Sequence, residues 1–180
     1  MIVDLVRSTC TRVVENSKHV KINQEKLKVL AKAIKDRPVF LDFFECEFHM
    51  SADNNIEDLV GYVFVIDALN FCFWPSKWEY ENLAVALKEA HKENPIIFTP
   101  EYLSTISAAE VKEKFFKGTE FPLLDERVRA VNEIGKKTME HFEGKFMNIL
   151  EKGEFDASKV LELVASTFLM FQDHAVYEGR

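Results

Sequence analysis

The chain has 180 residues, of which 47% are hydrophobic and 29% charged, as in an ordinary globular protein with one buried core. Its net charge of −7 argues against binding to duplex nucleic acid, because that binding depends on lysine and arginine neutralising phosphates. The first apolar residues are interrupted by charges and no apolar run is long enough to span a bilayer, so we predict a cytoplasmic protein with no membrane partner.

The first third of the chain predicts two amphipathic helices. Apolar residues recur at helical intervals over residues 1–16. Asn23 is expected to cap a second helix that runs to about Lys35. Its predicted buried stripe consists of Leu27, Leu30, Ala31 and Ile34. The aromatic segment 39–50 that follows fits neither a helix nor a strand clearly.

The middle of the chain predicts one strand and several helices. Residues 61–66 are rich in β-branched and aromatic side chains, which favours a strand. Residues 80–91 have the apolar spacing of a helix, and Ser107 to Glu110 form a capping box that opens another. A longer helix is predicted over residues 123–142. At its start, Glu126, Arg127 and Arg129 are expected to form a solvated ion-pair face.

The last predicted helix, capped by Asp156, has an unusually wide apolar arc. An arc of this width is expected to be buried on more than one side, and no obvious terminal cap follows it before Arg180. We therefore predict a fold that is mainly α with a small β element. It is expected to form a single helical domain over residues 1–180, truncated at its C-terminus.

The segment that follows the predicted strand, residues 67–74, combines residue types that suit binding of a purine-like base. Asp67 is expected at the end of a buried strand, where a carboxylate is costly unless it is paired or used. Asn70 offers a donor and an acceptor, and Trp74 offers a flat face for stacking. The alternative is structural: Asp67 and Asn70 cap backbone groups while the neighbouring aromatic side chains fill the core.

His49 is the second candidate, since a neutral imidazole in an aromatic stretch can hydrogen-bond a ligand carbonyl. The alternative is a core histidine whose hydrogen bonds are satisfied within the protein. The histidines are far apart in sequence and no zinc spacing or phosphate-binding loop occurs, so no metal site and no cofactor are predicted.

Several segments, in order, resemble the queuosine salvage protein family. Val65-Ile-Asp-Ala-Leu-Asn-Phe-Cys-Phe-Trp-Pro75 is similar to that family's Asp-x-Leu-Asn-Phe-x-Phe-Trp signature. Val14-Glu-Asn-Ser17 resembles a segment of its first helix, and Phe121-Pro-Leu-Leu-Asp-Glu-Arg127 resembles its Pro-Leu-x-Glu-Arg segment. Asn132-Glu-Ile-Gly135 and Tyr177-Glu-Gly-Arg180 are also similar to segments of the family. The resemblance covers the N-terminal half of the family's sequence.

The resemblance implies a mostly helical hydrolase that cleaves the N-glycosidic bond of queuosine 5'-phosphate and releases queuine for tRNA modification. It also implies that His49 lies near the base and that Asp67, Asn70 and Trp74 contribute to the substrate pocket. The family's Phe-Ala-Asp-Tyr-Arg motif, which carries its catalytic aspartate, does not occur in this sequence. The expected partners are therefore a small nucleotide or free queuine, together with a C-terminal half.

Two further functions remain open from the sequence. The wide apolar arc of the last helix is compatible with a non-catalytic module that binds a protein partner through an aromatic surface. A helical DNA-glycosylase-like protein is a weaker alternative, because the net charge is negative and no basic block is present.

Overall fold

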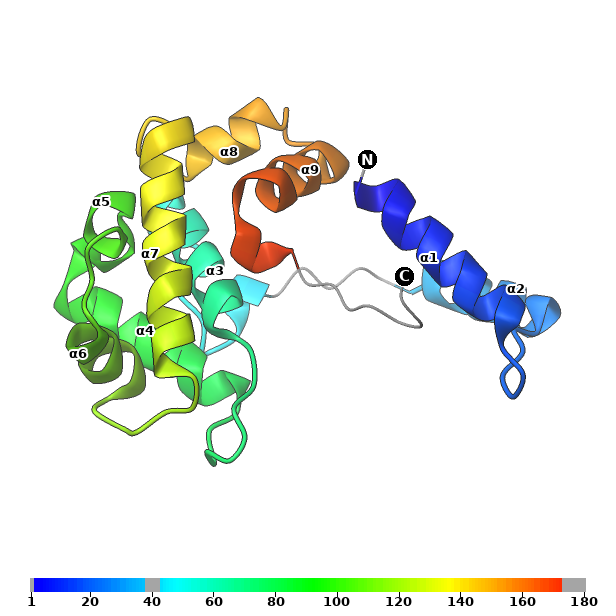
Figure 1. The fold of residues 1–180 in the computed structure, drawn as a ribbon, viewed down its shortest axis with the longest axis horizontal. Helices are drawn as coiled ribbons and strands as arrows, with labels where there is room; N and C mark the ends of the chain where they lie inside the picture. Colours follow the sequence, from blue (N-terminus) through cyan, green and yellow to red (C-terminus); the bar gives the residue numbers. More distant parts are fainter. Residues whose placement is uncertain (1, 38–42, 173–180) are drawn as a thin grey trace. The chain divides into compact units, whose positions relative to one another are not determined.

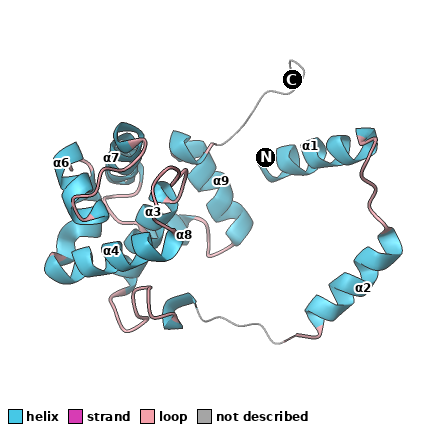
Figure 2. Ribbon diagram, turned by 90° about the horizontal axis from the view of Figure 1, so that it is seen from below, coloured by secondary structure: helices cyan, strands magenta, loops and turns pink. Residues whose placement is uncertain are grey.

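The computed structural model describes residues 2–37 and 43–172, with side chains described from Asp4 onward (Figure 1). The chain divides into two units, residues 1–42 and 43–180, which we describe separately. Within the described ranges every regular element is helical and no strand is present (Figure 2). The prediction of a mainly α fold is confirmed, whereas the domain boundaries 1–180 stay a prediction.

The first unit contains two helices, α1 (Ile2–Asn16) and α2 (Gln24–Lys35), as the sequence predicted. The Asn23 side chain caps α2 by accepting a hydrogen bond from the backbone N–H of Lys26 at 3.0 Å. However, α2 has no buried residue, so the burial predicted for its apolar stripe is wrong. Two short helices enclose too little volume to remove such a stripe from water.

The second unit is a bundle of helices and short turns. Its longer helices are α3 (Ile56–Leu69), α4 (Tyr80–Glu93), α7 (Leu124–His141) and α9 (Ala157–Thr167). Its shorter helices are α5 (Pro100–Leu103), α6 (Ala108–Glu110) and α8 (Met147–Lys152). The 3₁₀ turns are η1 (Phe43–Glu45), η2 (Pro95–Phe98) and η4 (Leu169–Phe171), and η3 (Val111–Phe115) is a π-helix.

Helix α3 occupies the centre of this unit and replaces the predicted strand. Its buried residues cover most of the helix surface, apart from one stripe that ends at the exposed Asp67, and it packs against α4, α7 and α8. Asn55 caps its N-terminus, and Glu57 and Asp58 are acidic residues in the first turn, where the helix dipole favours them. The strand prediction over residues 61–66 is wrong, because a helix that is buried over most of its surface also contains a nearly continuous run of apolar residues.

Helix α7 lies alongside α3 and passes very close to α5 (Figure 1). A Cβ atom on Gly135 would lie 2.3 Å from the backbone nitrogen of Ser104, so only glycine allows this approach. The Asn132 side chain donates hydrogen bonds of 3.0 Å to the carbonyls of Leu103 and Ile106. The Asn-Glu-x-Gly segment therefore fastens α7 to the turn that follows α5.

The remaining predicted helix boundaries agree with the structure. The capping box of Ser107 and Glu110 is present at α6. Gly144, with a φ of 70°, follows α7, and the Asp156 side chain caps α9. The apolar arc of α9 and the turn after it is only partly buried, since Phe168 is buried whereas Leu161 and Leu169 are exposed.

Candidate functional site

His49 lies at the centre of a group of aromatic and polar side chains in the second unit. It is buried, with 3% of its surface exposed. Its Nδ1 atom is 2.7 Å from the hydroxyl oxygen of Tyr62, and its Nε2 atom is 3.4 Å from that of Tyr80. The ring of Phe43 stacks on the imidazole with a centroid separation of 3.9 Å. We call His49, Tyr62, Tyr80 and Asp67 the His49 cluster.

The electrostatics of the His49 cluster favour a neutral imidazole. Burial, with a contribution from the positive charge of Lys88, lowers the pKa of His49 from its ordinary value of 6.5. A neutral imidazole has one donor nitrogen and one acceptor nitrogen, so the two tyrosine hydroxyls have complementary roles. This geometry supports the structural alternative for His49, because both ring nitrogens already have partners within the protein.

Asp67 acts on the same tyrosines from the last turn of α3. Burial is the first cause that raises the pKa of Tyr62 and of Tyr80, and the negative charge of Asp67 raises both further. Although the Asp67 side chain is exposed, the protein around its carboxyl group removes enough water to raise the pKa of that group. Asp67 therefore presents an accessible carboxyl group near the two tyrosines that contact His49.

The structure places Asp67 in a different element from the one predicted from the sequence. The residue was expected at the end of a buried strand, but it lies in a helix and faces solvent. Full burial therefore does not explain its presence. Asn70 is the C-terminal residue that caps α3, and its side chain is also exposed.

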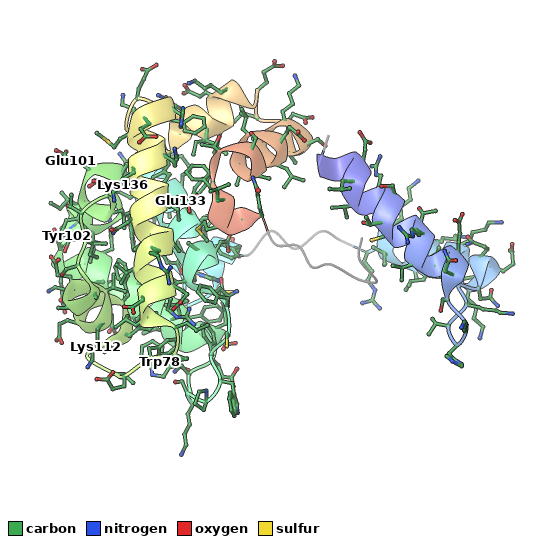
Figure 3. The ribbon with its side chains drawn as sticks, viewed as in Figure 1. Trp78, Glu101, Tyr102, Lys112, Glu133 and Lys136 are labelled. Carbon is green, nitrogen blue, oxygen red and sulfur yellow. The ribbon has the colours of Figure 1, made fainter. Side chains whose placement is uncertain are left out.

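The turn after α3, residues 70–74, presents Trp74 to solvent with 81% of its surface exposed. Phe71 and Phe73 are half-buried; Phe73 packs against the core, and the ring of Phe71 lies against the guanidinium of Arg127. Trp78, labelled in Figure 3, packs against Phe116 and Phe121 with centroid separations of 5.8 and 5.5 Å. The turn thus has an aromatic inner side and exposes Asn70 and Trp74 on its outer side.

Arg127, in the first turn of α7, organises the inner side of this turn. Its side chain is completely buried, so its predicted place on a solvated face is wrong. The Nε atom donates to the carbonyl of Pro122 at 3.0 Å, and the terminal nitrogens donate to the carbonyls of Leu69, Phe71 and Cys72. By contrast, the ion pair of Arg129 with Glu126 is exposed, as predicted.

The structure therefore brings His49 and Asp67 together through the tyrosines and places Asn70 and Trp74 on the turn that follows. Sequence reasoning missed Tyr62, Tyr80 and Arg127. Tyr62 was missed because residues 61–66 were predicted to form a strand. A helix capped by Asn55 would have predicted that Tyr62 is buried. For Arg127, the only signal was its place in the Pro-Leu-x-Glu-Arg segment.

Two features are absent from the described residues. No group of three or more histidine, cysteine or acidic side chains in residues 2–37 and 43–172 could hold a metal ion. Over the same ranges, no helix has the length and apolar character needed to cross a membrane.

The fold and these side chains define a helical protein in which aromatic and polar side chains gather around His49. The family model described as queuosine salvage protein matches residues 48–180. The chain belongs to the queuosine salvage protein family, which confirms the resemblance seen in its sequence.

Individual relatives agree with this assignment. A queuosine 5'-phosphate N-glycosylase/hydrolase from Dictyostelium discoideum is 35% identical over 98% of this chain. Proteins with the same name are 32% identical in Sphaerobacter thermophilus and 27% identical in Mus musculus, each over 97% of the chain. The chain spans 58%, 57% and 57% of the lengths of these three relatives.

Proposed function

We propose that this chain supplies the base-recognition part of an enzyme that cleaves the N-glycosidic bond of queuosine 5'-phosphate and releases queuine. The observation that carries the proposal is the position of the His49 cluster, which lies wholly inside the segment that matches the family. The names of the relatives supply the reaction and the substrate class. The product, queuine, is then available for tRNA modification, in agreement with the family's name.

The exposed groups of this region have the chemistry needed for a purine-like base with a positively charged arm. The carboxylate of Asp67 can accept hydrogen bonds from ring N–H groups or pair with an ammonium group. The exposed face of Trp74 can stack on the ring, and Asn70 can read its edge. His49 holds Tyr62 and Tyr80 in place through its two ring nitrogens.

A carboxylate must also stabilise the cationic sugar or activate water during N-glycosidic cleavage. The motif that the resemblance assigns to this role is absent from the sequence, and none of the His49 cluster residues is proposed to replace it. We therefore expect no release of queuine when the purified chain alone is incubated with queuosine 5'-phosphate. Sustained release by this chain would overturn that part of the proposal.

Binding of the base is tested by titrating queuine into the chain in a calorimeter. Asp67→Asn is expected to weaken binding roughly tenfold, because a hydrogen bond to a charged group contributes about 1.5–3 kcal/mol. Glu151→Gln, which makes the same chemical change at an exposed position of α8, is the control and should leave the affinity unchanged. Equal affinities of wild type and Asp67→Asn would exclude Asp67 from the site.

One observation favours a second function, a module that binds a protein partner. Leu161 and Leu169 in and after α9 are exposed by 45% and 66%. If this surface alone carries the function, Leu161→Ser should abolish binding to the partner and queuine should not bind at all. The same queuine titration therefore separates the two functions.

A further inference from the structure

Arg127 is a fully buried cation whose hydrogen-bond partners are all backbone carbonyls. No carboxylate of the described residues forms an ion pair with it. Burial lowers its pKa to about 10, so the guanidinium remains protonated at neutral pH. A charge in this position needs compensation from dipoles and aromatic rings, and the structure provides both.

The first compensation comes from the C-terminus of α3. Leu69 is the last residue of this helix, so its carbonyl lies at the negative end of the helix dipole, where it accepts from the N–H of Phe71 at 3.0 Å as well as from Arg127. The second comes from aromatic faces. The guanidinium carbon lies 4.1 Å from the ring centroid of Phe71 and 4.7 Å from that of Phe121.

These contacts determine the path of the backbone through the turn. Arg127 fixes the carbonyl groups on both sides of Asn70, at Leu69 and Phe71, and then the carbonyl of Cys72. Cys72 has a φ of 41°, in the left-handed region that non-glycine residues rarely adopt. Such a conformation persists only where the surroundings enforce it, and the hydrogen bond to Arg127 does so here.

We propose that Arg127 is the positioning residue of the base-recognition surface. By holding the carbonyls of the 70–74 turn on the inner side, it directs Asn70 and Trp74 outward in the arrangement that a planar heterocyclic base meets. Arg127 itself lies beneath the turn and does not touch the base. The identity of the ligand in this proposal rests on the proposed function. The control of the turn conformation by Arg127 is independent of it.

The test combines two measurements on the full chain carrying Arg127→Lys. A lysine ammonium retains the charge but lacks the fork of donors that reaches several separate carbonyls. Amide hydrogen exchange over residues 70–76 is expected to accelerate about tenfold, while exchange in the core helices α4 and α7 is preserved. Queuine affinity is expected to fall about tenfold in parallel. Arg129→Lys, two residues along the same helix and exposed, should change neither quantity.

Unchanged exchange over residues 70–76, or loss of protection throughout the unit to the same degree as in the turn, would overturn the positioning role. If Arg127→Lys does not fold, Phe121→Leu decides the question. It weakens one aromatic contact of the guanidinium while keeping an apolar side chain at a position below the turn. Faster exchange in the turn and weaker queuine binding are then expected, and wild-type values for both would overturn the proposal.

Failure of the proposed function gives a different pattern. If the wild-type chain binds no queuine, the function assigned to the surface is wrong. The exchange comparison between Arg127→Lys and Arg129→Lys then still decides whether Arg127 controls the turn.

Discussion

His49 and Arg127 are both buried nitrogen-containing side chains of the second unit, but the protein satisfies them in different ways. His49 has a lowered pKa and is paired with two tyrosine hydroxyls. Arg127 retains its charge and is surrounded by backbone carbonyls and aromatic rings. Burial thus removes the charge from one side chain, whereas fixed dipoles stabilise the charge of the other.

The difference indicates which region is more sensitive to substitution. Side-chain partners such as tyrosines can rotate away or be replaced by water when a contact is lost. Backbone carbonyls of a tight turn cannot, so loss of Arg127 leaves several acceptors without a partner at once. We therefore expect the region around Arg127 to contribute more to folding stability and the His49 cluster to contribute more to pH dependence.

The largest expected effect is that of Arg127→Met. Removing the guanidinium leaves the part-buried carbonyls of Phe71 and Cys72 without their donor, and the Leu69 carbonyl retains only the N–H of Phe71 at 3.0 Å. The free energy of unfolding, measured by urea denaturation, should fall by about 3–5 kcal/mol, because each carbonyl left without a donor costs about 1–3 kcal/mol. Arg129→Met is the matched control, because this arginine is exposed, and it should change stability by less than about 0.5 kcal/mol. Equal effects of the two substitutions would contradict the proposed difference between the regions.

A smaller effect is expected for Tyr62→Phe. The hydroxyl of Tyr62 is the partner of His49 Nδ1 at 2.7 Å, and the tyrosine is completely buried. Its removal should lower the free energy of unfolding by about 1–2 kcal/mol, because one buried ring nitrogen loses its partner. The same denaturation experiment measures this change. A loss as large as that of Arg127→Met would show that the two regions contribute equally to the free energy of unfolding.

The pH dependence of stability is a third test, with wild type compared with His49→Gln. The folded pKa of His49 lies below 6.5, so the unfolded chain binds a proton that the folded chain does not bind between these pKa values. The contribution of His49 is fully present above pH 6.5 and is lost as the pH falls toward the folded pKa. The stability difference between wild type and variant should therefore be greater at a pH well above 6.5 than at one below it. If the stability difference between wild type and His49→Gln instead increases as the pH falls, the pKa of His49 is not lowered by folding.

The smallest effect is expected for Tyr80→Phe. The distance from its hydroxyl to His49 Nε2 is 3.4 Å and the side chain is only half-buried, so the hydrogen bond is weak. Stability should fall by less than about 0.5 kcal/mol. Tyr102→Phe is a suitable control, because its hydroxyl makes a similar bond of 3.3 Å to Glu110. A much larger loss for Tyr80→Phe would show that Nε2 depends on this tyrosine.

The sequence predicted most helix boundaries because caps are local signals. Asn23, Ser107 and Asp156 all cap helices as expected. It failed for α3, since the β-branched and aromatic residues over positions 61–66 favour a strand locally, whereas burial over most of the helix surface overrides that preference. The acidic first turn after Asn55 was the signal for a helix.

The site was predicted only in part, because residue types can be read from the sequence but tertiary contacts cannot. His49, Asp67, Asn70 and Trp74 were singled out by residue type, and the structure places all of them in the second unit. The tyrosine partners of His49 and the burial of Arg127 depend on contacts between residues far apart in sequence. Arg127 and Arg129 are both arginines in the first turns of α7, and only the tertiary structure distinguishes the buried one from the exposed one.

The most direct test of base recognition is a calorimetric titration of the wild-type chain with queuine, with adenine titrated in parallel. We predict saturable binding of queuine, weaker binding of adenine, and loss of the queuine signal in the Asp67→Asn, Trp74→Ala double variant. An absence of queuine binding to the folded wild-type chain would contradict the proposed base recognition. Equal binding of queuine by wild type and the double variant would contradict it as well.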